Sequence, residues 1–248
     1  MPDIVLNIGL WWAPVLALAI ILHLSGLSKL RWSFLILGFA VSVVYIFTVL
    51  RAGQFIPLDD YIPGLQWNWS GKLASFAMTL LVLAVLSVLL REVTPARAGF
   101  RLKQEPGSVW PALLLIAACI GLMVVLTIQL GGGPQTSPER LAYQASMPGL
   151  DEEPHYRGLL LLLLNEAFGG KKIRILGAPI GWGGLAIVLI FGLGHGAGFN
   201  DGQFVFSAIS VGVTGFLGLA LLWVRERTGS LVMPIIGHNA INFVPSFF

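Results

Sequence analysis

Charged residues are scarce in this sequence. Asp, Glu, Lys and Arg make up 11% of its 248 residues, while hydrophobic residues make up 56%. Soluble domains carry about 25% charged residues. A chain with so little charge cannot cover the surface of a soluble fold, so that class is excluded and a membrane protein is indicated.

Cysteine is almost absent too. The single Cys119 lies inside an apolar stretch, which excludes an intrachain disulfide, a CxxC redox pair and a cysteine-built metal cluster. The sequence also has no internal repeat or heptad pattern, so solenoid and coiled-coil folds are excluded. The net charge of +3 comes from basic residues between apolar runs, where membrane topology explains them, and we expect no nucleic-acid partner.

Eight apolar runs are present. They cover approximately residues 4–25, 33–50, 72–90, 109–130, 153–168, 178–198, 204–224 and 230–247. Eight crossings of about 20 residues would use about 160 positions, which leaves short loops and no room for a soluble domain. We therefore predict an all-α fold, a single polytopic membrane domain (1–248) with about eight transmembrane helices. Four N-terminal spans lie in 1–130 and four further spans in 150–248. No basic segment precedes the first run, so we expect that run to be a retained span rather than a signal peptide.

The basic residues predict an orientation. Eleven of the fifteen fall in the odd-numbered loops: Lys29, Arg31, Arg91, Arg97, Arg101, Lys103, Lys171, Lys172, Arg174, Arg225 and Arg227. The even-numbered loops hold only Arg51, Lys72 and Arg140. Lys and Arg are retained on the cytoplasmic side, so we expect a multi-pass protein of the lipid bilayer, in a bacterial inner membrane, with both termini outside.

Ionisable residues inside apolar runs are costly and therefore indicate function. They occur at the start of the fifth run (151–157), at His195, at His238 with the neighbouring Asn242, and at Glu166. We expect Glu152 in the first turn of its helix and His195 in the last turn of an oppositely directed one. Together with His238 and Asn242 these residues would share the outer half of the bundle, and Glu166 would lie at the other face.

Spacing suggests different roles for the two glutamates. Glu153 and Arg157 are four residues apart and can pair on one helix face, which would leave the Glu152 carboxylate free. Pro154 fits a first helical turn, where no intrahelical N–H is needed. A glutamate near an imidazole is a candidate general base for hydrolysis. His238 and Asn242 present two donors on one face, as an oxyanion hole requires.

These residues resemble a known family, the CPBP intramembrane proteases, which include CAAX endopeptidases and Abi-type bacteriocin-processing and immunity proteins. Three motifs match in order from about residue 150 onward. The pattern EExxxR matches Glu152, Glu153 and Arg157, FxxxH matches Phe191 and His195, and HxxxN matches His238 and Asn242. The first four spans match only as generic membrane helices.

The resemblance implies an intramembrane endopeptidase that cleaves a membrane-anchored peptide or protein tail. Glu152 would activate water, His195 would share that water, and His238 with Asn242 would stabilise the oxyanion, with Glu153 and Arg157 supporting them. We predict no cofactor. The alternative is a zinc set of Glu152, His195 and His238, which the lack of HExxH and the presence of Asn242 beside His238 disfavour. An outward-facing site is similar to myxosortase-type members rather than to CAAX endopeptidases that act on cytosolic tails.

Two other functions fit parts of the pattern. A non-catalytic scaffold or immunity protein with the same fold would keep the motifs only for packing, and His238 and Asn242 can serve as interhelical hydrogen-bonding residues. A proton-coupled transporter would use Glu152, Arg157 and His195 as a relay, but the sequence shows no matched broken helices. For His23, His155 and Glu166 we favour structural roles.

Overall fold

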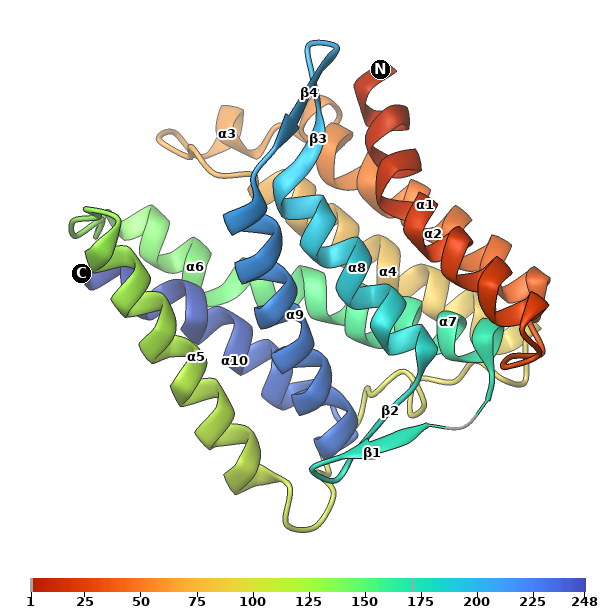
Figure 1. Cartoon of the computed structure of the whole chain (residues 1–248). Helices are drawn as coiled ribbons and strands as arrows, with labels where there is room; N and C mark the ends of the chain where they lie inside the picture. Colours follow the sequence, from red (N-terminus) through yellow and green to blue (C-terminus); the bar gives the residue numbers. More distant parts are fainter. Residues whose placement is uncertain (1, 171) are drawn as a thin grey trace.

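The structure is a computed structural model that describes residues 2–170 and 172–248. Lys171, one of the basic residues that predicts the orientation, and Met1 lie outside the described residues. Among the described residues, each of the eight apolar runs forms a helix, which confirms the predicted all-α bundle (Figure 1). The helices outside the fifth run are α1 (Pro2–Leu24), α2 (Trp32–Arg51), α4 (Trp69–Leu89), α5 (Val109–Gln129), α8 (Trp182–Gly196), α9 (Ala208–Thr228) and α10 (Val232–Phe243).

Five of these segments are long and apolar enough to cross a membrane, while α8 is apolar but shorter. The five are Pro2–Leu24, Trp32–Tyr61, Trp69–Leu89, Val109–Gln129 and Ala208–Thr228. The second of them includes the short turns η1 (Ala52–Gln54) and α3 (Leu58–Tyr61). The protein is therefore an integral membrane protein.

The fifth helical segment is longer than predicted. It begins with α6 (Pro138–Glu152), continues through the π-helical segment η2 (Glu153–Leu160) and ends with α7 (Leu161–Phe168). Ser137 caps its start by accepting a hydrogen bond from the backbone N–H of Arg140. The prediction that Glu152 lies in a first helical turn is wrong, because the polar residues of α6 form no apolar run although they are helical.

Two short hairpins interrupt the helices where we predicted only loops and span ends. One joins β1 (Ile173–Ile175) to β2 (Ala178–Ile180), and the other joins β3 (Ala197–Asn200) to β4 (Gln203–Phe206). The β3–β4 turn is Asp201-Gly202, and both residues have positive φ (51° and 75°). Such a two-residue Asp-Gly turn suits the twist of a hairpin.

The outer edge of β3 is fastened to α1. Asn7 donates a side-chain hydrogen bond to the carbonyl of Phe199 (3.2 Å) and accepts one from its N–H (2.5 Å). The indole of Trp11 donates to the carbonyl of Ala197 (2.7 Å). These bonds satisfy backbone groups that a hairpin edge otherwise leaves open.

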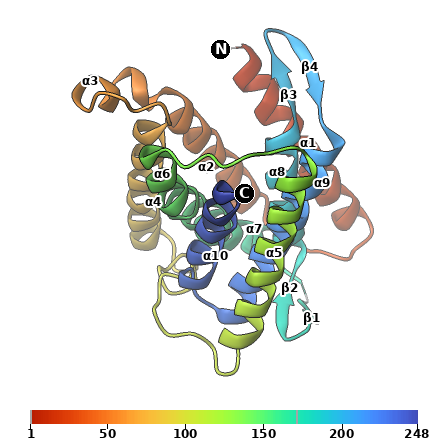
Figure 2. The same cartoon turned by 90° about the vertical axis from the view of Figure 1, so that its left-hand side faces the viewer.

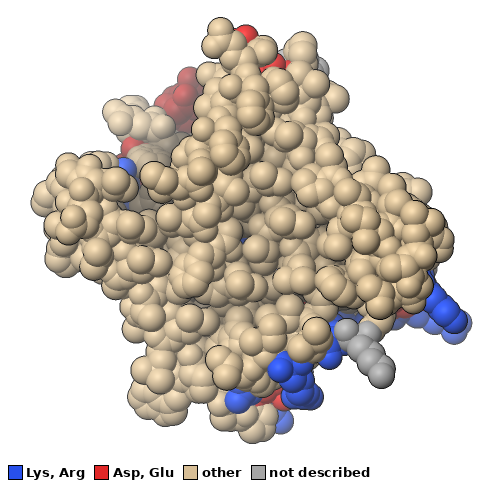
Figure 3. All heavy atoms as spheres, in the orientation of Figure 1, with Lys and Arg blue, Asp and Glu red and all other residues tan. Residues whose placement is uncertain are grey.

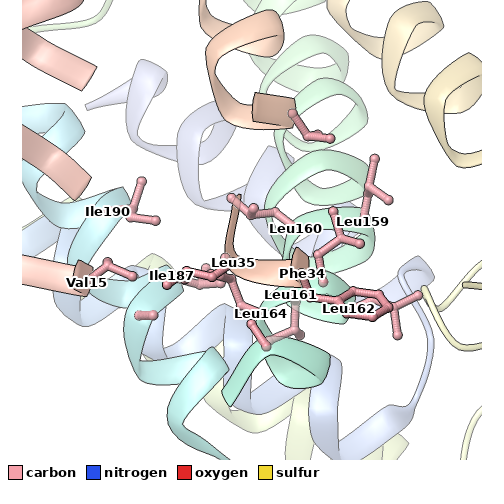
Figure 4. Close-up of a cluster of buried hydrophobic side chains, with 14 of the residues drawn as sticks. Val15, Phe34, Leu35, Leu159, Leu160, Leu161, Leu162, Leu164, Ile187 and Ile190 are labelled. Carbon is pink, nitrogen blue, oxygen red and sulfur yellow. The ribbon is translucent and has the colours of Figure 1, made fainter. Parts of the chain in front are cut away.

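The core lies where η2 and α7 pass between α2 and α8. Leu159 to Leu164 are all buried there, and Phe34, Leu35, Ile187 and Ile190 pack against them (Figure 4). The helices α7 and α8 approach closely at Gly183, where an added Cβ would lie 2.6 Å from the backbone nitrogen of Asn165. The fifth segment is thus the central element of the bundle, and the polar residues that it carries lie among packed helices.

The two ends of the bundle differ in charge. The β1–β2 hairpin and the loops after α1, α4 and α9 lie at one end, and the β3–β4 hairpin and α3 lie at the other (Figures 1 and 2). On the face shown in Figure 3, Lys and Arg gather mainly along the lower edge, where the first of these ends lies. Glu166 lies at this basic end, as predicted, and it pairs there with Arg31 (2.6 Å) and Arg97 (2.5 Å).

Candidate active site

The site begins at η2, where the chain departs from regular α-helical bonding. Pro154 has no N–H to donate to the preceding turn, which favours a widened turn at this position. The carbonyl of Arg157 accepts a hydrogen bond from Nε of Arg225 on α9 (3.1 Å). Pro154 is thus accommodated by a π-helical segment and not, as predicted, by a helix start.

Glu152 is paired with a lysine. Nζ of Lys72, on the first turn of α4, lies 2.5 Å from Oε1 of Glu152 and 3.0 Å from Oδ2 of Asp151. The prediction that the Glu152 carboxylate is free is therefore wrong for one of its two oxygens. The other oxygen, Oε2, is buried and has no hydrogen-bond partner among residues 2–170 and 172–248.

Glu153 and Arg157 form the predicted pair, and both side chains are fully buried. Nη1 of Arg157 donates to Oε1 of Glu153 (2.9 Å), and the guanidinium also stacks over the ring of Phe191 (4.1 Å). Oε1 of Glu153 lies 2.7 Å from Nδ1 of His238. An ionised carboxylate only accepts hydrogen bonds, so Nδ1 of His238 carries a proton. Nε2 of the same ring then points toward Glu152, with Oε2 4.0 Å away.

Glu152 and His195 line the same pocket. Its volume is about 140 Å³, and its wall also includes Lys72, Tyr45 and Tyr156. His195 lies in the last turn of α8, as predicted. Its Nδ1 lies 2.7 Å from the carbonyl of Phe191. Because a carbonyl cannot donate, Nδ1 carries a proton, and in the neutral tautomer that this defines Nε2 is an acceptor.

Asn242 follows His238 by one turn on α10 and is half-buried. Within the described ranges its side chain makes no hydrogen bond, and it does not line the pocket that holds Glu152. The neighbouring Asn239 instead accepts a bond from the N–H of Gly149 (2.7 Å), which joins α10 to α6. The structure therefore brings together Glu152, His195 and His238 and leaves Asn242 beside them.

Four residues around Glu152 were given no role from the sequence: Asp151, Lys72, Tyr45 and Ser75. Asp151 is buried and accepts hydrogen bonds from Tyr45 (2.7 Å) and Ser75 (2.5 Å), besides its contact with Lys72. Lys72 stands at the start of an apolar run, although the predicted orientation counts it as a loop residue. A lysine inside a span is costly and marks a function or a partner, and that signal was readable in the sequence.

The residues do not fit the zinc alternative as they are arranged. Within the described part of the chain, no three His, Cys, Asp or Glu side chains are placed to hold a metal ion together. The ammonium of Lys72 also occupies Oε1 of Glu152, and a second cation at this carboxylate would be repelled.

A buried group of carboxylates and histidines around a small pocket has the groups that general acid–base chemistry needs. Residues 134–244 match the family model described as Rce1-like, type II CAAX prenyl endopeptidase Rce1-like. Over these residues the chain is similar to that family of membrane proteases, which confirms the resemblance to the CAAX proteases. The match runs from just before α6 to the end of α10, and so it includes every residue of the three motifs. No curated protein and no solved structure matches the chain.

Proposed function

We propose that this protein is an intramembrane endopeptidase that hydrolyses a membrane-anchored peptide or protein tail with a water molecule activated by Glu152. One observation carries the proposal. Oε2 of Glu152 is buried and has no hydrogen-bond partner among the described residues. The pocket that Glu152 lines is also lined by His195, whose Nε2 accepts hydrogen bonds in this proposal.

The two acceptors orient the water. A water molecule between them donates one hydrogen to Oε2 of Glu152 and the other to Nε2 of His195, so its lone pairs remain free for attack. Glu152 takes the first proton while the oxygen bonds to the carbonyl carbon of the scissile peptide. The proton then passes to the leaving nitrogen as the C–N bond breaks, which releases a carboxylate and an amine.

The oxyanion of the tetrahedral intermediate needs donors. Nε2 of His238 donates only when its ring is doubly protonated, because Nδ1–H is already engaged by Glu153. In this proposal Asn242, one turn further along α10, supplies the second donor. Arg157 holds Glu153 in place through the hydrogen bond from Nη1 to Oε1.

The substrate approaches from the end that carries the β3–β4 hairpin. His195 is two residues before β3, and the basic loops are at the opposite end of the bundle, the end that the positive-inside rule assigns to the cytoplasm. Accordingly, the termini lie outside, and the pocket is reached from the non-cytoplasmic side of a bacterial inner membrane.

The test compares Glu152→Gln and His195→Ala with the parent chain by a proteome-wide survey of membrane-protein termini. We expect the same set of cleaved termini to disappear in both variants. Glu92→Gln and His23→Ala are matched controls, because both side chains are exposed to solvent and away from the pocket. Termini that are unchanged in both active-site variants would reject proteolysis and favour the scaffold function.

A further inference from the structure

Lys72 is a largely buried cation on an otherwise apolar helix, with 13% of its side chain exposed. A lysine in such a position is held by partners, and here the partners are the carboxylates of Asp151 and Glu152. The two carboxylates differ in what remains open. Both oxygens of Asp151 are occupied, by Tyr45, Ser75 and Lys72, whereas Oε2 of Glu152 has no hydrogen-bond partner among the described residues.

The contacts form a chain from α2 to the pocket. Tyr45 on α2 and Ser75 on α4 fix Asp151, Asp151 fixes Lys72, and Lys72 fixes Oε1 of Glu152. One ammonium between two carboxylates leaves the group with a net negative charge. Oε2 of Glu152, which accepts no hydrogen bond from a described residue, can therefore accept a proton.

We propose that Lys72 is a positioning residue for the hydrolysis: by holding Oε1 of Glu152 it orients the carboxylate so that Oε2 alone receives the proton from water. This inference rests on the proposed function of Glu152. Lys72 also lines the pocket wall, so it acts at the place where the water binds.

A purely structural lysine would neutralise buried charge without regard to which oxygen stays open. A positioning lysine changes the chemistry of the carboxylate that it touches. Several other titratable or charged side chains lie near Glu152, and their charges also act on its carboxylate. They are Asp151, His238, His195, His155, Tyr45, Tyr143 and Tyr156, with Glu153 and Arg157 behind His238.

The experiment measures kcat, KM and the pH profile of kcat/KM for Lys72→Met, Lys72→Arg and Asp151→Asn in the full chain, using a substrate identified by the termini survey. For Lys72→Met we expect kcat to fall about 100-fold with little change in KM, the size of effect that a misplaced reacting group produces. Lys72→Arg restores part of this loss because it keeps the charge. Lys172→Met is the matched control, because Lys172 pairs with Glu226 at the basic end.

The direction in which the acidic limb of the kcat/KM profile moves tests the charge interaction between Lys72 and Glu152. Without the ammonium, ionised Glu152 loses a favourable charge interaction, so the acidic limb moves to higher pH by about one unit or more. Asp151→Asn removes a negative charge, so its acidic limb moves to lower pH. Opposite shifts support the inference, and these shifts are not expected from a change in packing alone.

Two outcomes would overturn the inference separately from the proposed function. If Glu152→Gln is inactive while folded Lys72→Met keeps the parental kcat and pH profile, the role of Lys72 is rejected and that of Glu152 stands. If Glu152→Gln is active, the proposed function itself fails. If Lys72→Met does not yield folded protein, Asp151→Asn decides, and an unshifted acidic limb in that variant rejects the inference.

Discussion

At the scale of single residues, the buried pair of Glu153 and Arg157 is supported from three sides. Arg157 donates to Glu153, reaches the carbonyl of Gly218 on α9 (3.3 Å) and stacks on Phe191, while Glu153 also binds His238. Removing one member of such a group leaves a charge buried without its counterion, which costs more than the pair itself contributes.

Arg157→Met should therefore destabilise the protein by about 3–5 kcal/mol, the usual cost of breaking a buried ion pair. The measurement is thermal unfolding in detergent. The control is Glu105→Gln, which breaks an exposed i,i+4 pair with Arg101 and should change stability by less than about 1 kcal/mol. Equal unfolding temperatures for the parent and Arg157→Met would contradict this account of the pair.

The residues of the site were predictable to different degrees. Glu153 and Arg157 were paired correctly because an i,i+4 relation is local. The partner of Glu152 was not predicted, because Lys72 is 80 residues away in the sequence and only packing of α4 against α6 brings them together. The catalytic roles of Glu152, His195, His238 and Asn242 stay predictions.

At the scale of elements, the start of α6 is fastened to the loop between α3 and α4 by Glu139. Its Oε1 accepts hydrogen bonds from the N–H groups of Gln66 (2.8 Å) and Trp67 (2.9 Å) and from the indole of Trp69 (3.1 Å). Desolvation opposes ionisation, but these three donors outweigh it and lower the pKa of the Glu139 carboxyl below its ordinary value.

A lowered pKa in the folded state means that the contact stabilises the loop at pH values above the unfolded pKa of about 4.3, and that the stabilisation disappears as the pH falls through the folded pKa. We expect hydrogen exchange of residues 62–68 to be slow at neutral pH and to accelerate in acid. Glu139→Gln should make exchange fast at neutral pH and remove the acid dependence. Slow exchange in this variant at every pH would show that other contacts hold the loop.

The close crossing of α7 and α8 requires a glycine, Gly183, at the point of contact. Gly183→Ala would place a Cβ 2.6 Å from the backbone of Asn165, and because backbone cannot move aside cheaply we expect a loss of about 1–3 kcal/mol. Gly121→Ala on α5 is the control, since nothing lies within 4 Å of its added Cβ, and it should be neutral or stabilising by up to about 1 kcal/mol. Both are measured by thermal unfolding in detergent, and equal losses would contradict the close crossing.

The elements show why hydropathy predicts helices better than it predicts their ends. All eight apolar runs formed helices, because burial in lipid requires every backbone group to be satisfied internally. The polar helix α6 and the two hairpins were not predicted as elements. The capping pattern of Ser137 and Pro138 and the Asp201-Gly202 turn are visible in the sequence, but they lie outside the apolar runs, so hydropathy does not detect them.

At the scale of the whole molecule, the single cysteine offers a test of orientation. Cys119 is 2% exposed, so a membrane-impermeant maleimide should not label the parent chain in intact cells. Asp201→Cys, at the tip of the β3–β4 hairpin, should be labelled from outside, whereas Lys103→Cys, in the loop at the basic end, should be labelled only after the cells are opened. The reverse pattern would place the hairpin in the cytoplasm and reverse the proposed direction of substrate approach.

The hydrogen bonds between α1 and β3 join residues that are synthesised at very different times. Asn7 and Trp11 bind residues 192 and 186 positions later in the chain. At a synthesis rate of about 5–20 residues per second, their partners are made about 10–40 s after they are. The hydrogen bonds that fasten α1 to β3 therefore form long after α1 is made, and until then the side chain of Asn7 lacks the partner that it has in the finished protein.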